Sequence, residues 1–77
     1  MAQNITVRIP SHLYENNPGL ARERGDQLAT REVADRLLRA TNHMPGEKAI
    51  KAGLVLDEIL PFDEGTHDIA FTYRYAA

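Results

Sequence analysis

Both ends of the chain alternate apolar and polar side chains with a period of two, which is typical of a strand with one buried face. Near the N-terminus the apolar positions are Ile5, Val7 and Ile9. Near the C-terminus they are Ile69, Phe71, Tyr73 and Tyr75. Because four large β-forming side chains on one face need an apolar cover, we expect the terminal strands to pair and to pack on a helix.

The clearest helical pattern covers residues 30–44, where apolar residues recur along one stripe. Thr30 is its expected N-cap, and Pro45 and Gly46 follow its end. Upstream, the NNPG cluster at residues 16–19 predicts a turn, because proline and glycine disfavour a helix interior. We therefore expect no continuous helix across that cluster.

Residues 47–60 fit two patterns at once. Their apolar residues form a helical stripe, and they also form one face of a strand that Glu58 interrupts. We expect a short helix that ends near Gly53, followed by a strand over residues 54–60.

Length limits this chain to one domain. A chain of 77 residues buries only about 60% of its unfolded surface, which is enough for one small core. We therefore expect a single compact α+β domain over residues 1–77. In it, a small antiparallel sheet of the two terminal strands and the 54–60 strand packs on one main helix at residues 30–44.

Composition excludes several classes of protein. The chain has no cysteine, so disulfides, zinc ribbons and thiol chemistry are ruled out. Its uncharged runs are far shorter than the roughly 20 residues of a membrane helix, and its start lacks a signal-peptide pattern. The net charge of −2 argues against non-specific binding to nucleic acid. We expect a cytoplasmic protein that contacts no membrane.

No residue pattern identifies a reaction. None of the three histidines lies in a nucleophile pattern or an HExxH motif, and no glycine-rich loop precedes a helix as a phosphate cradle. A domain of this size also has little room for a small-molecule pocket. We expect neither enzymatic activity nor a cofactor.

One segment gathers oxygen and nitrogen groups that could bind a metal ion. Its members are Asp63, Glu64, His67 and Asp68. Hairpin loops favour such residues for backbone reasons alone, and the spacing of a calcium loop is absent. No metal site is predicted.

Residues 4–41 combine a short strand, a proline and two stretches of helical character, and this run resembles ribbon-helix-helix DNA-binding proteins. In that family two chains pair their strands into a ribbon that lies in the major groove. The resemblance implies that the polar strand residues face the bases, a reading that suits the hydrogen-bonding groups of Asn and Arg. These residues are Asn4, Thr6 and Arg8.

The same resemblance places Gly25 in the turn between two helices and Thr30 at a helix N-terminus that meets a phosphate. It makes a dimeric DNA-binding transcriptional regulator or antitoxin the alternative function.

Elimination favours a different function, namely binding another protein without catalysis. The acidic stretch near the C-terminal strand could meet a basic surface of that partner. Its residues are Asp57, Glu58, Asp63, Glu64 and Asp68. The unpaired edges of a three-stranded sheet also suit strand addition or a homodimer. Small cysteine-free domains of this kind are common among phage and mobile-element accessory proteins, so we expect a small modulator or inhibitor of that type.

Overall fold

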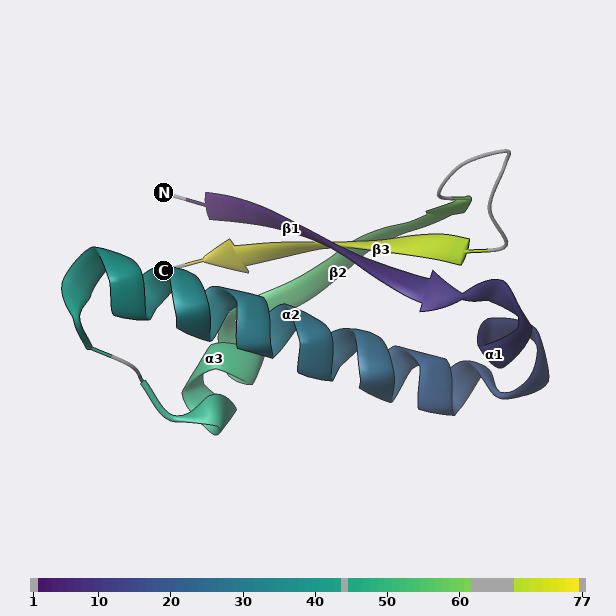
Figure 1. Cartoon of the computed structure of the whole chain (residues 1–77), viewed down its shortest axis with the longest axis horizontal. Coiled ribbons are helices and arrows are strands. Elements are labelled where there is room, and N and C mark those ends of the chain that lie inside the picture. The colour runs from purple at the N-terminus through teal and green to yellow at the C-terminus, as the bar shows by residue number, and fades with distance from the viewer. Residues whose placement is uncertain (1, 44, 62–67, 77) are drawn as a thin grey trace.

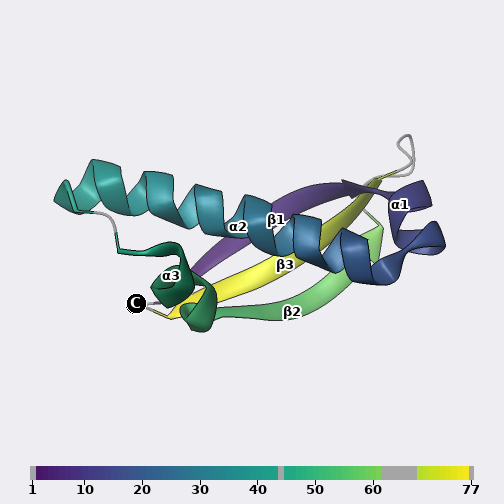
Figure 2. The ribbon, with the colours of Figure 1, turned by 90° about the horizontal axis from the view of Figure 1, so that it is seen from below.

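Three antiparallel strands form one sheet in the order β1-β3-β2, and the helices lie on one of its faces (Figures 1 and 2). This computed structural model describes residues 2–43, 45–61 and 68–76. In chain order the elements are β1 (Ala2–Pro10), α1 (Ser11–Asn16), α2 (Pro18–Thr41), α3 (Glu47–Gly53), β2 (Leu54–Pro61) and β3 (Asp68–Ala76). The predicted α+β architecture is confirmed.

The terminal strands pair with each other, as the period-two pattern predicts. In the antiparallel register of β1 and β3, Ile5 lies opposite Tyr73 and Val7 lies opposite Phe71. These apolar side chains all turn toward the helices and are buried. The polar side chains between them therefore lie on the other face of the sheet.

The main helix is longer than its apolar stripe predicts. The structure starts α2 at Pro18, twelve positions before Thr30, so the expected boundary at residue 30 is wrong. The break at the NNPG cluster is confirmed, since the side chain of Asn17 caps α2 by accepting from the Leu20 N–H at 3.2 Å. Proline is destabilising inside a helix but is favoured at the first position, where its missing N–H would have no partner.

The first half of α2 contacts the sheet through small residues. Its buried positions there are Ala21, Gly25 and Ala29, spaced four apart on one side of the helix. A Cβ added at Gly25 would lie 2.8 Å from Phe71 Cδ2 and 2.8 Å from Tyr73 Oη. Gly25 thus permits close contact between helix and sheet, and its implied place in a turn between two helices is wrong.

The helix also ends earlier than residue 44. Asn42 caps α2 in the left-handed conformation, with φ 55°, and its N–H donates to the Leu38 carbonyl at 3.0 Å. Asparagine tolerates this conformation better than most residues, so it can stop a helix without glycine. Pro45 and Gly46 lie beyond this cap.

The middle segment forms both predicted elements, the short helix α3 and the strand β2. Irregular pairing between Leu56 and Glu58 marks a bulge in β2. Before the bulge Leu56 lies opposite the buried Tyr73, and after it Ile59 lies opposite Phe71. The bulge therefore explains why Glu58 interrupts the expected strand face: one extra residue shifts the alternation.

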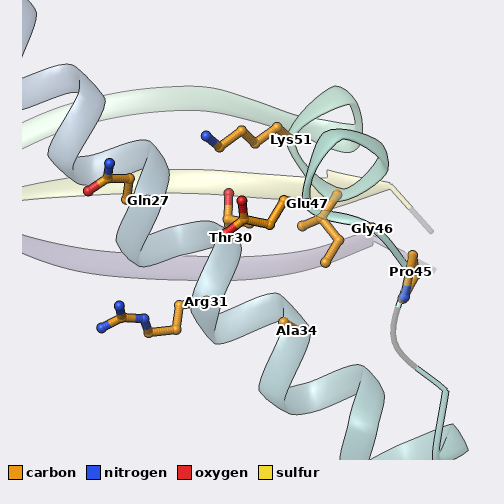
Figure 3. A pocket seen from close by; sticks show the side chains of 9 residues that line it. Gln27, Thr30, Arg31, Ala34, Pro45, Gly46, Glu47 and Lys51 are labelled. Carbon is orange, nitrogen blue, oxygen red and sulfur yellow. The ribbon is translucent and has the colours of Figure 1, made fainter.

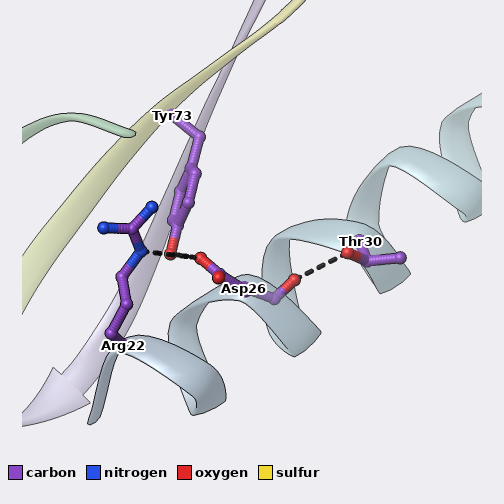
Figure 4. Close-up of polar contacts among 4 residues, drawn as sticks. All are labelled: Arg22, Asp26, Thr30 and Tyr73. Atoms are coloured by element: carbon purple, nitrogen blue, oxygen red, sulfur yellow. Dashed lines mark hydrogen bonds and ion pairs between the residues drawn. The ribbon is translucent and has the colours of Figure 1, made fainter. Parts of the chain in front are cut away.

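A polar contact joins α2 to the buried side of the sheet (Figure 4). The Tyr73 hydroxyl donates to Asp26 Oδ1 at 2.6 Å, and Arg22 Nε donates to the same oxygen at 3.0 Å. One turn further on, the Thr30 hydroxyl donates to the Asp26 backbone carbonyl at 2.7 Å. Thr30 is buried in the middle of α2, so its predicted role as an N-cap that meets a phosphate is wrong.

Burial raises the pKa of Tyr73 well above its ordinary value, and the hydrogen bond to Asp26 raises this pKa further. The folded state thus holds the phenol proton more tightly than the unfolded chain does. The resulting stabilisation is complete below pH ~10, the pKa of an unfolded tyrosine, and is lost as the pH rises toward the higher pKa of the folded state.

We therefore expect the difference in unfolding free energy between the natural chain and Tyr73→Phe to stay constant below pH ~10 and to shrink above it. Urea denaturation of both proteins between pH ~8 and pH ~11.5 measures this difference. The other two tyrosines are common to both proteins and largely cancel. A difference that does not change over this range would contradict the assignment.

Candidate functional site

The face of the sheet opposite the helices is covered by no described helix (Figure 2). We call it the open face. Its residues include Asn4, Thr6, Arg8, Val55, Glu58, Leu60, Asp68, Ala70, Thr72 and Arg74, which the strand registers place on it, and Asp57, whose side chain pairs with Arg74. Most of these residues are exposed, whereas the small side chain of Ala70, aligned with Arg8 and Leu60, is buried.

The open face brings together residues that the sequence assigned to two competing functions. The strand residues implied for DNA contact lie on it, and so do three of the acids predicted for protein contact. Asn4, Thr6, Asp57, Glu58 and Thr72 together line one shallow hollow. The two predicted sites are therefore neighbouring parts of a single surface.

The bulge in β2 gives this surface two adjacent carboxylates. In a regular strand, neighbouring side chains point to opposite faces. Here Asp57 and Glu58 both line the hollow, together with Thr72. A bulge re-aims side chains in this way at sheet edges, and it doubles the acidic groups at this edge of the open face.

Two ion pairs tie the strands together across the open face. Arg74 Nε lies 2.8 Å from Asp57 Oδ1, which joins β3 to β2. Arg8 Nε lies 3.3 Å from Asp68 Oδ2, which joins β1 to β3. All four side chains are partly exposed, so each pair is worth roughly 0–1 kcal/mol and mainly orders the surface.

Glu58 is the acid of the open face whose side chain makes no ion pair or hydrogen bond with the described part of the chain. With two arginines against three carboxylates, the described open face carries one net negative charge. Two further predicted partner-binding acids, Asp63 and Glu64, lie outside the described residues, as does His67. Among the described residues no group of three or more potential ligands could hold a metal ion.

Apolar side chains flank Glu58. Val55 and Leu60 lie on the open face and are 51% and 47% exposed. Ile59, on the helix side of the same edge strand, is 38% exposed. Exposed apolar side chains beside a polar patch are a feature of surfaces that bind other macromolecules.

Comparison of the chain with protein-family models, curated proteins and solved structures finds no match. Function must then be inferred from the chemistry of the surface itself. The described open face offers carboxylates, guanidinium groups, an amide and hydroxyls, but no histidine or serine that could form a nucleophile and base pair. These groups bind by charge and hydrogen bonding. No helix of the described chain is long and apolar enough to span a membrane.

Sequence reasoning missed part of this surface. Thr72 and Arg74 are the polar members of the alternation in β3, so the same period-two rule that identified the core could have found them. The exposed positions of Val55 and Leu60 could not be found that way, because the bulge between them changes the alternation.

Proposed function

We propose that this chain is a non-enzymatic protein-binding module whose contact surface is the open face. The observation that carries the proposal is the position of Glu58, an acid without an ion pair among the described residues, between the exposed side chains of Val55 and Leu60. Exposed apolar side chains beside an acid without an ion pair offer a partner both apolar contact and charge.

The charge of the face defines the partner's chemistry. A lysine or arginine placed opposite Glu58 would gain a salt bridge, and apolar side chains beside it would cover Val55 and Leu60. Asn4 and Thr6, across the hollow from β2, offer hydrogen bonds at the rim. We infer a partner with a basic side chain set in an apolar patch.

A small domain that covers such a basic patch would block other ligands of that patch. We therefore assign the chain to the class of small modulators or inhibitors, of the kind found among phage and mobile-element accessory proteins. This assignment rests on the size of the chain and on the acidity of the face.

Charge reversal at Glu58 tests the surface. We expect Glu58→Lys to weaken capture of the partner from a lysate of the source cells by roughly three- to tenfold, because an attraction becomes a repulsion. Glu23→Lys, which changes the charge equally on the exposed side of α2, is the matched control. Equal capture by all three proteins would show that the partner does not bind at Glu58.

DNA binding is the second candidate, because Asn4, Thr6 and Arg8 are displayed on a sheet face of the kind that can enter a major groove. Against it, both described arginines of the open face are already paired with acids. Fluorescence anisotropy with duplex DNA at low salt tests this candidate. Salt-dependent binding that falls on Arg8→Ala would favour it over the protein-binding proposal.

A homodimer through a sheet edge also stays a prediction. At the free edge of β1, Arg36 already donates to the Asn4 carbonyl at 3.2 Å. If two copies paired their β2 edges antiparallel, centred on the bulge, Asp57 and Glu58 of one copy would lie opposite the same acids of the other. Like charges directly opposite each other are unfavourable. Sedimentation equilibrium over a range of protein concentrations would measure the dimer directly.

A further inference from the structure

A cavity of about 510 Å³ lies between α2 and α3, on the helical side of the molecule (Figure 3). This volume falls within the range of sites that bind small molecules, so the expectation that so small a domain has little room for a pocket is wrong. Pro45, Gly46 and the short helix α3 line one side of the cavity, and the middle of α2 lines the other.

The cavity has an apolar lining with basic groups around it. Ala34 of α2 and Pro45 of the loop are partly exposed and supply apolar surface, whereas Ile50 of α3 also lines the cavity but is only 1% exposed. Arg31 of α2 and Lys51 of α3 also line the cavity and reach from the two helices that bound it (Figure 3). A ligand here would meet apolar surface on its body and positive charge from two separate elements.

The two cations have no partner in the described part of the chain. Neither Arg31 nor Lys51 makes an ion pair or a side-chain hydrogen bond with any described residue. This contrasts with Arg22, Arg36 and Arg74, each of which binds a carboxylate. Glu47 is the one acid among the residues that line the cavity, so the cavity carries a net positive charge.

We propose that this cavity binds a small organic anion with a single carboxylate on an apolar body, such as an aryl or alkyl carboxylic acid. The carboxylate would make a charge-assisted hydrogen bond with one of the two cations, Arg31 or Lys51, and would be attracted by the charge of the other. The body would cover Ala34 and Pro45, the partly exposed apolar residues of the lining. This site lies on the opposite side of the sheet from the open face, so the proposal does not depend on the proposed function.

The lining distinguishes this ligand from two other classes. A cation would face two positive side chains against one acid. An inorganic phosphate would find the two cations but would leave the apolar surface of Ala34 and Pro45 in water, so it would gain nothing from the burial of that surface.

The test uses 4-phenylbutyrate as the probe in an NMR titration of the labelled full chain. We expect saturable amide shifts at Gln27, Ala34, Ile50 and Lys51, all of which line the cavity, and none on β1. The neutral analogue 4-phenylbutan-1-ol should bind at least about tenfold more weakly, because it cannot make the charged hydrogen bonds. Equal binding of acid and alcohol would overturn the anion assignment.

Two double variants distinguish binding in this cavity from an effect of the net charge of the protein. Arg31→Glu with Lys51→Glu should weaken binding of 4-phenylbutyrate at least about tenfold. Arg39→Glu with Lys48→Glu changes the net charge equally on the same two helices, outside the cavity lining, and should change binding less than about twofold. Absence of shifts at ~10 mM probe, or equal loss in both double variants, would overturn the proposal.

Discussion

Gly25→Ala is expected to destabilise the domain by about 1–3 kcal/mol, although alanine is the better helix former by about 1 kcal/mol. The added methyl group would lie 2.8 Å from both Phe71 Cδ2 and Tyr73 Oη. Neither neighbour moves easily, since Phe71 is fully buried and Tyr73 is held by its hydrogen bond to Asp26. The helix must therefore move away from the sheet.

The matched control is Gly19→Ala in the first turn of the same helix. There the added methyl would meet only Asn17 Oδ1, at an ordinary contact distance of 3.7 Å. We expect this variant to keep or slightly raise the unfolding free energy, by less than about 1 kcal/mol. Chemical denaturation of the three proteins measures both effects. If both variants gave the same change, the close approach of α2 to β3 at Gly25 would be refuted.

Asp26→Ala is the second large effect, with an expected loss of about 1–3 kcal/mol of unfolding free energy. Tyr73 lies in the core and is 1% exposed, and its hydroxyl donates a hydrogen bond to Asp26. Without that carboxylate the hydroxyl stays buried and loses its partner. The exposed pair between Arg22 and Asp26 adds only a few tenths of a kcal/mol.

A double-mutant cycle with Tyr73→Phe isolates this bond. Once the hydroxyl is gone, Asp26→Ala should cost at least about 1 kcal/mol less than it does in the natural chain, because no buried donor is left without a partner. Asp26→Asn keeps an oxygen acceptor and should fall between the natural chain and Asp26→Ala. Additive losses from Asp26→Ala and Tyr73→Phe would show that the two side chains do not interact.

Strand patterns predicted the fold well because buried apolar side chains alternate with polar ones along β1 and, with Ala70 as the exception, along β3. Large apolar side chains such as Phe71 and Tyr73 must be buried wherever they occur in a strand, so their alternation predicts directly which face of the strand packs in the core. The helix and strand in the middle segment were also predicted, since Gly53 marks the point where the helical stripe stops.

The start of α2 could not be predicted from an apolar stripe, because its sheet contact there uses Ala21, Gly25 and Ala29. Small side chains carry little hydrophobic signal, and the close packing they permit becomes apparent only when the sheet is present. The bulge in β2 was equally hidden, since it depends on pairing with β3. Likewise, the ion pairs of Asp68 with Arg8 and of Asp57 with Arg74 join residues of different strands and required the tertiary structure.

Site-specific photo-cross-linking tests the central claim, that the open face is the protein-binding surface, most directly. A benzophenone side chain would replace the exposed residue at position 6 or 58 of the open face, or at position 23 on the far side of α2. In the source cells we expect positions 6 and 58 to cross-link to the same protein and position 23 to cross-link to none. Cross-links from position 23 alone, or to DNA from position 6, would contradict the claim.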